Sequence, residues 1–214
     1  ESDPPADRAA YSYPDLAGDL EQQMDAAGMA AALLVGSSMG AHTAIRFALD
    51  RPERVRGLVL ITPAYLPGAA GPGDQARWDA RSEGLRNGGI EGFIAADEDL
   101  RSLGEGSKLL TEVVRQRLSL HRNLDAVADA LSWVPRSRPF ETIGELETVT
   151  APTLVIGDRD ELDPGHPLAV AERWAAAIPG AALLVEEPGQ RPIAWQGGAV
   201  SRAVVAMAED AGLR

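Results

Sequence analysis

Two short apolar runs separated by one helix-sized segment constrain the fold of this chain more than any other feature. The runs are residues 30–35 (AAALLV) and 57–62 (GLVLIT), and each has the length and composition of a strand buried on both faces. Residues 39–50 between them have the pattern of a helix, which Pro52 then stops. A strand, a helix and a second strand within about thirty residues predict a right-handed crossover unit of a parallel sheet.

Two further apolar runs extend this α/β pattern towards the C-terminus. Residues 151–156 and 181–186 each resemble a buried strand, and a helical segment at about 167–178 separates them. Four strands are few for an open sheet of this class. We therefore expect either a small sheet or further strands on sequence that precedes Glu1.

The middle of the chain has a different character. Between Tyr65 and Thr150, a loop rich in glycine and proline is followed by short helical stretches without strand-like alternation. We predict an α/β fold with a mostly parallel sheet, flanking helices and a helical lid insertion. The expected parts are residues 1–64 for the first part of the α/β core, 65–150 for the lid and 151–214 for the second part of the core.

Composition excludes several classes of function. The chain of 214 residues has 20 Lys and Arg against 32 Asp and Glu, which gives a formal net charge of −12. This balance argues against binding to nucleic acid, which requires a basic face, and against attachment to an anionic membrane. The absence of cysteine excludes disulfides and thiolate chemistry, and three histidines are few for a metal site. We expect a cytoplasmic protein that binds a small-molecule substrate without a metal ion or other cofactor.

The sequence GSSMG at 36–40 matches the pattern G-x-S-x-G at the junction between the first apolar run and the helix after it. A sharp strand-to-helix turn requires glycines here, because the start of the helix closely approaches the end of the strand. Ser38 would then have a positive φ and lie at the positive end of the helix dipole. Ser38 is therefore the candidate nucleophile, the Met39 N–H the candidate oxyanion donor, and Ser37 a further candidate hydroxyl. An ordinary glycine and serine turn is the structural alternative.

Four segments resemble the α/β-hydrolase fold family and together cover nearly all of the chain. They are GSSMG at 36–40, RPERVRGLVLITPA at 51–64, APTLVIGDRDELDP at 151–164 and IPGAALLVEEPG at 178–189. In this family the catalytic residues follow the order Ser, Asp, His. The resemblance implies that Asp160, the last residue of a G-x-x-D pattern, is the acid of the triad. A solvated acidic loop is the better interpretation for its neighbours, including Asp163.

The chain departs from the family at the position of the catalytic base. The resemblance implies a histidine in the loop after the last strand, and Gln190 stands at that position. Glutamine forms hydrogen bonds but takes up no proton near neutral pH, so it is no general base. Three explanations stay open: a deliberate substitution of histidine, natural loss of the base, or a base supplied by another histidine. His166, six residues after Asp160, is the candidate for that role, whereas packing or surface positions suit His42 and His121 better.

The beginning of the chain also departs from the family. The resemblance implies an oxyanion-hole loop and several strands before the first apolar run, and residues 1–3 resemble the end of that loop. We therefore expect a complementary N-terminal segment or chain, or a homo-oligomer, to cover a strand edge that is otherwise open.

These observations predict a serine hydrolase of the α/β-hydrolase type that acts on a small ester, thioester, lactone or amide. Trp133 in the lid and Trp195 after the Gln190 loop are candidates for the substrate pocket, with core packing as the ordinary alternative. Two other classes stay open: a binding protein that keeps the fold without catalysis, and a cofactor-free lyase or transferase on the same fold. The glutamine at the base position also leaves open whether the enzyme is active.

Overall fold

The computed structural model describes residues 3–69, 72–102, 107–159, 163, 165–210 and 212. The chain divides into two units, which we call the core unit and the helical unit. The core unit comprises Tyr13–Ala69 and Pro139–Arg214, and the helical unit comprises Glu1–Ser12 and Ala70–Arg138. These boundaries differ from the predicted lid boundaries at residues 65 and 150. The physical reason is that Phe140 and Leu146 are buried in the hydrophobic core of the core unit.

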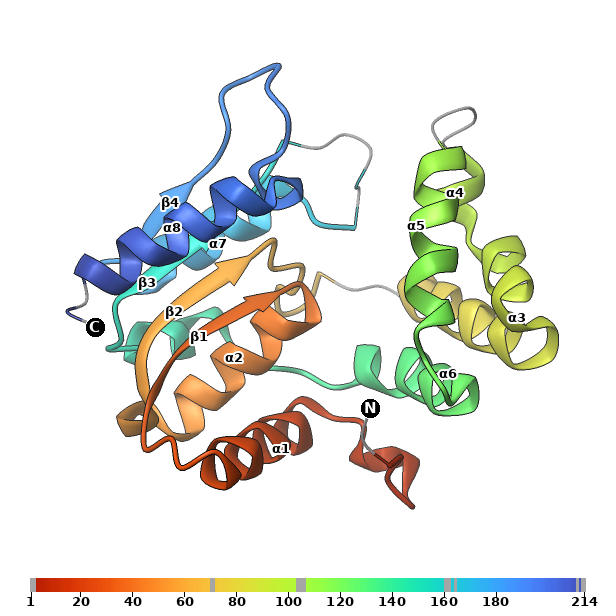
Figure 1. Cartoon of the computed structure of the whole chain (residues 1–214), viewed down its shortest axis with the longest axis horizontal. Helices are drawn as coiled ribbons and strands as arrows, with labels where there is room; N and C mark the ends of the chain where they lie inside the picture. The colour runs from red at the N-terminus through yellow and green to blue at the C-terminus, as the bar shows by residue number, and fades with distance from the viewer. Residues whose placement is uncertain are drawn as a thin grey trace. The chain divides into compact units, whose positions relative to one another are not determined.

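The core unit contains a parallel sheet with the strand order β1-β2-β3-β4 (Figure 1). Its strands are β1 (Ala32–Ser37), β2 (Val55–Ile61), β3 (Thr153–Ile156) and β4 (Ala182–Leu184). The register pairs Ser37 with Ile61, Ile61 with Ile156 and Ile156 with Leu184, so the carboxyl ends of the strands meet at one edge. The predicted α/β fold with a parallel sheet is confirmed.

Helices cover both faces of this sheet. Alternate residues of β2 separate two hydrophobic clusters, because successive side chains of a strand point to opposite faces. Leu58 and Leu60 pack with α1 (Tyr13–Ala26), α2 (Met39–Asp50) and α7 (Leu168–Ala177). Val59 and Ile61 pack with α8 (Gly197–Asp210) through Met207. Short 3-10 helices complete the core unit at η2 (Pro52–Arg54), η5 (Ile143–Thr148) and η6 (Ile193–Trp195).

The described part of the helical unit contains helices and no strand. Its elements are η1 (Arg8–Ala10), α3 (Pro72–Ala96), α4 (Glu98–Ser102), α5 (Ser107–Ser119), α6 (Leu124–Trp133) and η4 (Val134–Arg136). Leu85, Phe93 and Ala128 form its buried apolar cluster. Gly89 has a φ of 60°, and α3 bends there because only glycine adopts this conformation without strain.

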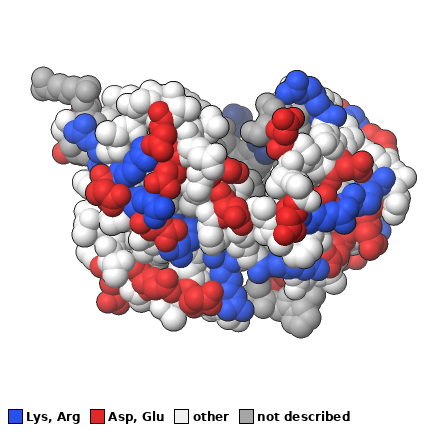
Figure 2. Space-filling model, turned by 90° about the horizontal axis from the view of Figure 1, so that it is seen from below, with Lys and Arg blue, Asp and Glu red and all other residues white. Residues whose placement is uncertain are grey.

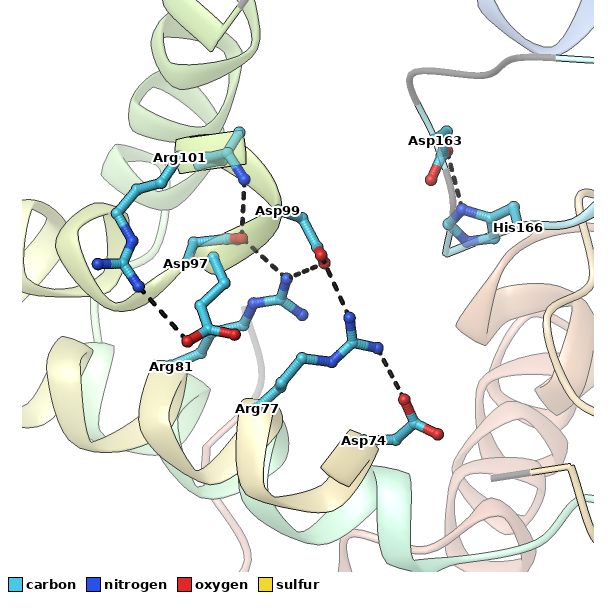
Figure 3. Close-up of polar contacts among 10 residues, drawn as sticks. Asp74, Arg77, Arg81, Asp97, Asp99, Arg101, Asp163 and His166 are labelled. Atoms are coloured by element: carbon cyan, nitrogen blue, oxygen red, sulfur yellow. Dashed lines mark hydrogen bonds and ion pairs between the residues drawn. The ribbon is translucent and has the colours of Figure 1, made fainter. Parts of the chain in front are cut away.

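A partly buried ion-pair network joins α3 to the residues at the start of α4 (Figure 3). The Arg81 guanidinium donates to Asp97 at 2.9 Å and to Asp99 at 2.6 Å, and Arg81 and Asp97 are both buried. Arg77 also donates to Asp99, at 3.2 Å. This network holds α3 against the following helix inside the helical unit.

Opposite charges are interspersed on the face of the chain drawn in Figure 2. The described side chains on the face shown in Figure 2 alternate between basic and acidic residues rather than forming one basic patch. Arg54 and Arg51 illustrate the pattern, since they pair with Asp25 at 2.7 Å and with Glu21 at 2.8 Å. None of the described helices combines the length and the apolar composition that a membrane span requires.

Candidate active site

The turn between β1 and α2 places Ser38 at the carboxyl edge of the sheet. Ser38 has a φ of 52° and a ψ of −115°, an unfavourable conformation for a residue with a side chain. Two backbone hydrogen bonds hold it, because its N–H donates to the Ile61 carbonyl at 2.9 Å and its own carbonyl accepts from His42 N–H at 3.1 Å. A Cβ atom at Gly36 would lie 2.2 Å from the Gly40 carbonyl oxygen, so the first glycine of the pattern is sterically required. The resulting turn leaves the Ser38 side chain partly exposed.

The Ser38 hydroxyl is hydrogen-bonded to His166. The distance from Ser38 Oγ to His166 Nε2 is 2.7 Å, although the two residues are 128 positions apart in the chain. His166 lies in the segment between β3 and α7, and the parallel sheet brings the carboxyl ends of β1 and β3 to the same edge. The sheet topology therefore explains how two distant segments meet at this site.

Asp163 orients the His166 ring. Its Oδ2 lies 2.8 Å from His166 Nδ1, and its backbone carbonyl accepts the His166 N–H at 3.1 Å (Figure 3). An ionised carboxylate only accepts hydrogen bonds, so Nδ1 carries a proton in this arrangement. Nε2 of the neutral ring is then an acceptor that faces the Ser38 hydroxyl. The side chains of His166 and Asp163 are 24% and 27% exposed, so solvent reaches the pair.

Gln190 lies in the turn after β4, and its side chain is exposed. Its backbone N–H donates to the Glu187 carbonyl at 3.0 Å. Within the described residues, the side chain hydrogen-bonded to the Ser38 hydroxyl is that of His166, and the Gln190 side chain makes no hydrogen bond to it. Asp160, which the resemblance implies as the acid, lies outside the described residues. The geometry therefore joins Ser38 with His166 and Asp163, a histidine that the sequence left open and a carboxylate that it interpreted as solvated.

The remaining candidates from the sequence occupy different positions. Met39 is the first residue of α2, so its N–H is one of the donors that a helix N-terminus leaves without an intrahelical partner. Ser37 ends β1 with an exposed side chain. Trp195 in η6 is 48% exposed, and Trp133 belongs to α6 of the helical unit and is 39% exposed. His121 follows α5 and is also exposed.

A buried carboxylate that the sequence analysis missed supports the segment after β3. Glu186 accepts a hydrogen bond from Arg159 N–H at 2.5 Å and another from Ile193 N–H at 3.3 Å. Its side chain thereby connects the beginning of the loop that carries Asp163 and His166 to the segment after Gln190. The available signal was an acidic residue directly after an apolar strand, where a carboxylate is costly to bury without donors.

His42 is a buried residue of α2, one helical turn after Ser38. Burial and, as the smaller cause, the nearby His166 lower the pKa of His42 to about 3. His42 is therefore neutral at neutral pH. No group of three or more His, Asp and Glu side chains in the described part of the chain forms a metal-binding arrangement.

Comparison with known proteins identifies sequence and structural relatives. The family profile described as the alpha/beta hydrolase fold matches residues 1–198. A 2-hydroxy-6-oxononadienedioate/2-hydroxy-6-oxononatrienedioate hydrolase of Pseudomonas putida is 31% identical over 175 residues, which are 78% of this chain and 58% of that protein. The chain spans less than two thirds of the length of the curated relatives that it matches first.

Two solved structures illustrate the similarity of fold. An esterase from Thermogutta terrifontis superposes with a TM-score of 0.75 at 24% identity, over 99% of this chain and 75% of the esterase. The enol-lactonase from Burkholderia xenovorans LB400 superposes with a TM-score of 0.70 at 21% identity, over 95% of this chain and 75% of the lactonase. At these identities the structural similarity concerns the fold alone.

Proposed function

Because the chain belongs to the α/β-hydrolase fold family, we propose that it is a serine hydrolase that uses Ser38, His166 and Asp163. The substrate class is a small ester, thioester, lactone or amide. The observation that carries the proposal is the 2.7 Å hydrogen bond between Ser38 Oγ and His166 Nε2. The distance lies within the range that proton transfer to a general base requires.

The mechanism follows from the protonation states of this site. Ser38 Oγ attacks the substrate carbonyl carbon while its proton moves to His166 Nε2. Asp163 stabilises the imidazolium that forms, because its carboxylate accepts the Nδ1 proton. The Met39 N–H donates to the oxyanion of the tetrahedral intermediate.

The second half of the reaction uses the same residues in reverse. His166 returns its proton to the leaving group, and an acyl group remains bound to Ser38. A water molecule then loses a proton to His166 and attacks the acyl carbonyl. The bond between the acyl carbon and Ser38 Oγ breaks while His166 gives its proton to Oγ, which releases the acid product and restores the Ser38 hydroxyl. Gln190 plays no part in these steps, so the base and the acid both come from the segment after β3.

Labelling with a fluorophosphonate probe tests the proposal without knowledge of the substrate. The probe reacts with an activated serine hydroxyl, and mass spectrometry locates the modified residue. We expect rapid, stoichiometric labelling of Ser38 in the natural sequence and loss of labelling in Ser38→Ala. A panel of activated small esters, thioesters and lactones then measures turnover.

Gln190 distinguishes this proposal from the explanations in which the base is altered or lost. If His166 is the base, Gln190→Ala changes the labelling rate by less than about threefold, because a surface substitution away from the site has small effects. Slow labelling of the natural sequence, with a large gain in Gln190→His, would contradict the proposal and support loss of the base at position 190.

A non-catalytic binding protein is the second candidate function, and the glutamine at the usual base position favours it. In that case no activated ester is turned over and the probe labels no serine. Gln190→His would also bring no gain in either assay.

A further inference from the structure

His42 is a buried histidine that the proposed mechanism does not use. It lies one helical turn after Ser38 on α2 and is 6% exposed. Its ring packs among three aromatic side chains, with centroids 5.4 Å from Tyr13, 6.3 Å from Tyr65 and 5.7 Å from Trp174. These residues come from α1, the segment after β2 and α7, so His42 lies where three parts of the core unit meet.

Both nitrogens of His42 have hydrogen-bond partners. The Ala64 N–H donates to Nε2 at 3.0 Å, and Nδ1 lies 2.8 Å from the Tyr13 hydroxyl. Because Nε2 is an acceptor, the neutral ring carries its proton on Nδ1. Protonation of the ring would turn Nε2 into a donor and break the bond to Ala64. The low pKa of about 3 for His42, caused by burial and by His166, keeps this acceptor available at neutral pH.

The segment held by His42 is strained. Thr62 has a φ of 44°, and among the described residues Ser38 and Thr62 are the non-glycine residues with positive φ. Such a conformation persists only where surrounding contacts hold it. The Thr62 N–H donates to the Ile156 carbonyl at 2.7 Å on one side of the turn, and the bond from Ala64 N–H to His42 holds the other side.

The strained turn is connected directly to Ser38. The carbonyl of Ile61, the residue before Thr62, accepts the Ser38 N–H at 2.9 Å. The Ile61 carbonyl belongs to the same peptide group as the Thr62 nitrogen, so a rotation at Thr62 displaces this acceptor. A release of the turn would therefore weaken one of the two backbone bonds that hold Ser38.

We propose that His42 is a positioning residue, which holds the Thr62 turn through Ala64 and thereby fixes the backbone of Ser38. The role of Ser38 as nucleophile rests on the proposed function. The contact itself, between His42, the turn after β2 and the Ser38 amide, does not depend on it.

Two substitutions at His42 separate positioning from packing. In His42→Gln, the side-chain oxygen reaches the position of Nε2 and still accepts the Ala64 N–H. In His42→Asn, the amide group reaches the position of Nδ1 and the Ala64 N–H loses its acceptor. We expect the fluorophosphonate labelling rate of Ser38 to stay within about threefold in His42→Gln and to fall about 10- to 100-fold in His42→Asn. Equal rates in the two variants would overturn the proposal.

Thr62→Gly provides a double-mutant test. Glycine adopts a positive φ without the steric cost of threonine, so the turn depends less on an external hold. The effect of His42→Asn on the labelling rate is therefore expected to shrink at least about threefold in the Thr62→Gly background. An unchanged effect would show that His42 acts by another route and would overturn the proposal.

Amide hydrogen exchange keeps the proposal testable if Ser38 is not the nucleophile or if His42→Asn fails to fold. In His42→Asn, we expect faster exchange at both Ala64 and Ser38, whereas His42→Gln retains protection at both amides. If the asparagine variant does not fold, the natural sequence should show similar exchange rates at the two amides, because both bonds open together. Faster exchange at Ala64 with unchanged protection at Ser38 would refute the coupling. If the probe does not label Ser38 in the natural sequence but the Ala64 and Ser38 amides still exchange together, the proposed function alone is refuted.

Discussion

Asp163→Asn is the most direct test of the acid in the candidate site. The substitution keeps the size of the side chain and removes the charge that faces His166 Nδ1 at 2.8 Å. Asparagine also presents an amide N–H₂ group, which permits the wrong tautomer of the ring. Both effects act when His166 takes up the Ser38 proton. The variant should therefore react more slowly at Ser38 while keeping its folded structure.

The size of the effect follows from the geometry. Two unit charges about 4 Å apart interact by about 4 kcal/mol at an effective dielectric constant of about 20. The His166 and Asp163 side chains are 24% and 27% exposed, and solvent screening reduces the interaction. We therefore expect a loss of about 2–3 kcal/mol of transition-state stabilisation, which corresponds to a labelling rate lower by about 30- to 150-fold.

The assay is the fluorophosphonate labelling rate of Ser38 at pH 8, compared between Asp163→Asn and Asp160→Asn. The second variant represents the acid that the family resemblance implies. If Asp163 is the acid, Asp160→Asn should have the smaller effect, within about threefold of the natural sequence, because Asp160 would then take no part in the proton transfer. A large loss in Asp160→Asn with an unchanged rate in Asp163→Asn would refute the assignment of Asp163. Circular dichroism of both variants provides the control for folding.

Three further predictions concern stability. The pKa of His42 is about 3 in the folded chain and 6.5 in the unfolded chain. The unfolded state therefore binds more protons below pH 6.5, and the free energy of unfolding decreases as the pH is lowered. Between pH 7 and pH 4, urea unfolding should show the natural sequence losing about 3 kcal/mol more than His42→Gln, and parallel curves would contradict this. Gly36→Ala places a Cβ atom 2.2 Å from the Gly40 carbonyl oxygen, so thermal unfolding should reveal a loss of about 1–3 kcal/mol or more. Arg81→Met leaves the Asp97 carboxylate buried without its guanidinium, and denaturant unfolding should show a loss of about 3–5 kcal/mol, whereas an unchanged midpoint would refute the role of the pair.

Local sequence patterns were sufficient to predict the sheet. The apolar run at 30–35 predicted β1, which is observed at Ala32–Ser37, and the run at 57–62 predicted β2, observed at Val55–Ile61. The helix between them was predicted at 39–50 and is observed at Met39–Asp50. Such elements are predictable because burial on both faces requires continuous apolar strands, and a crossover connection joins parallel strands.

The boundaries of the helical insertion were less predictable. Helical periodicity in the middle of the chain indicated helices, but it contained no signal for which neighbours they contact. Phe140 and Leu146 belong to the core unit because their side chains are buried in its hydrophobic cluster, where Phe140 contacts Trp174. Ser12 ends a segment that belongs with the helical unit. Contacts of this kind depend on the path of the whole chain.

Ser38 shows what the sequence by itself determined. The pattern G-x-S-x-G after an apolar run predicted a sharp turn with a positive φ at Ser38, which is observed. A Cβ atom at Gly36 would collide with the Gly40 carbonyl, whereas a Cβ atom at Gly40 would meet nothing within 4 Å, so the first glycine is the sterically required one. These are local steric consequences of adjacent residues. The membership of the family, too, was evident from segments distributed along the chain.

Only the tertiary structure decided which side chains meet the Ser38 hydroxyl. The sequence left His166 as one of three explanations and assigned Asp163 to a solvated loop. The structure places His166 Nε2 2.7 Å from Ser38 Oγ and Asp163 Oδ2 2.8 Å from His166 Nδ1. The sequence also contained no signal for the positive φ of Thr62 or for the hydrogen bond from Ala64 N–H to His42. The physical reason is that these contacts form between residues distant in the chain, where the parallel sheet aligns strand ends and the loops set the direction of each side chain.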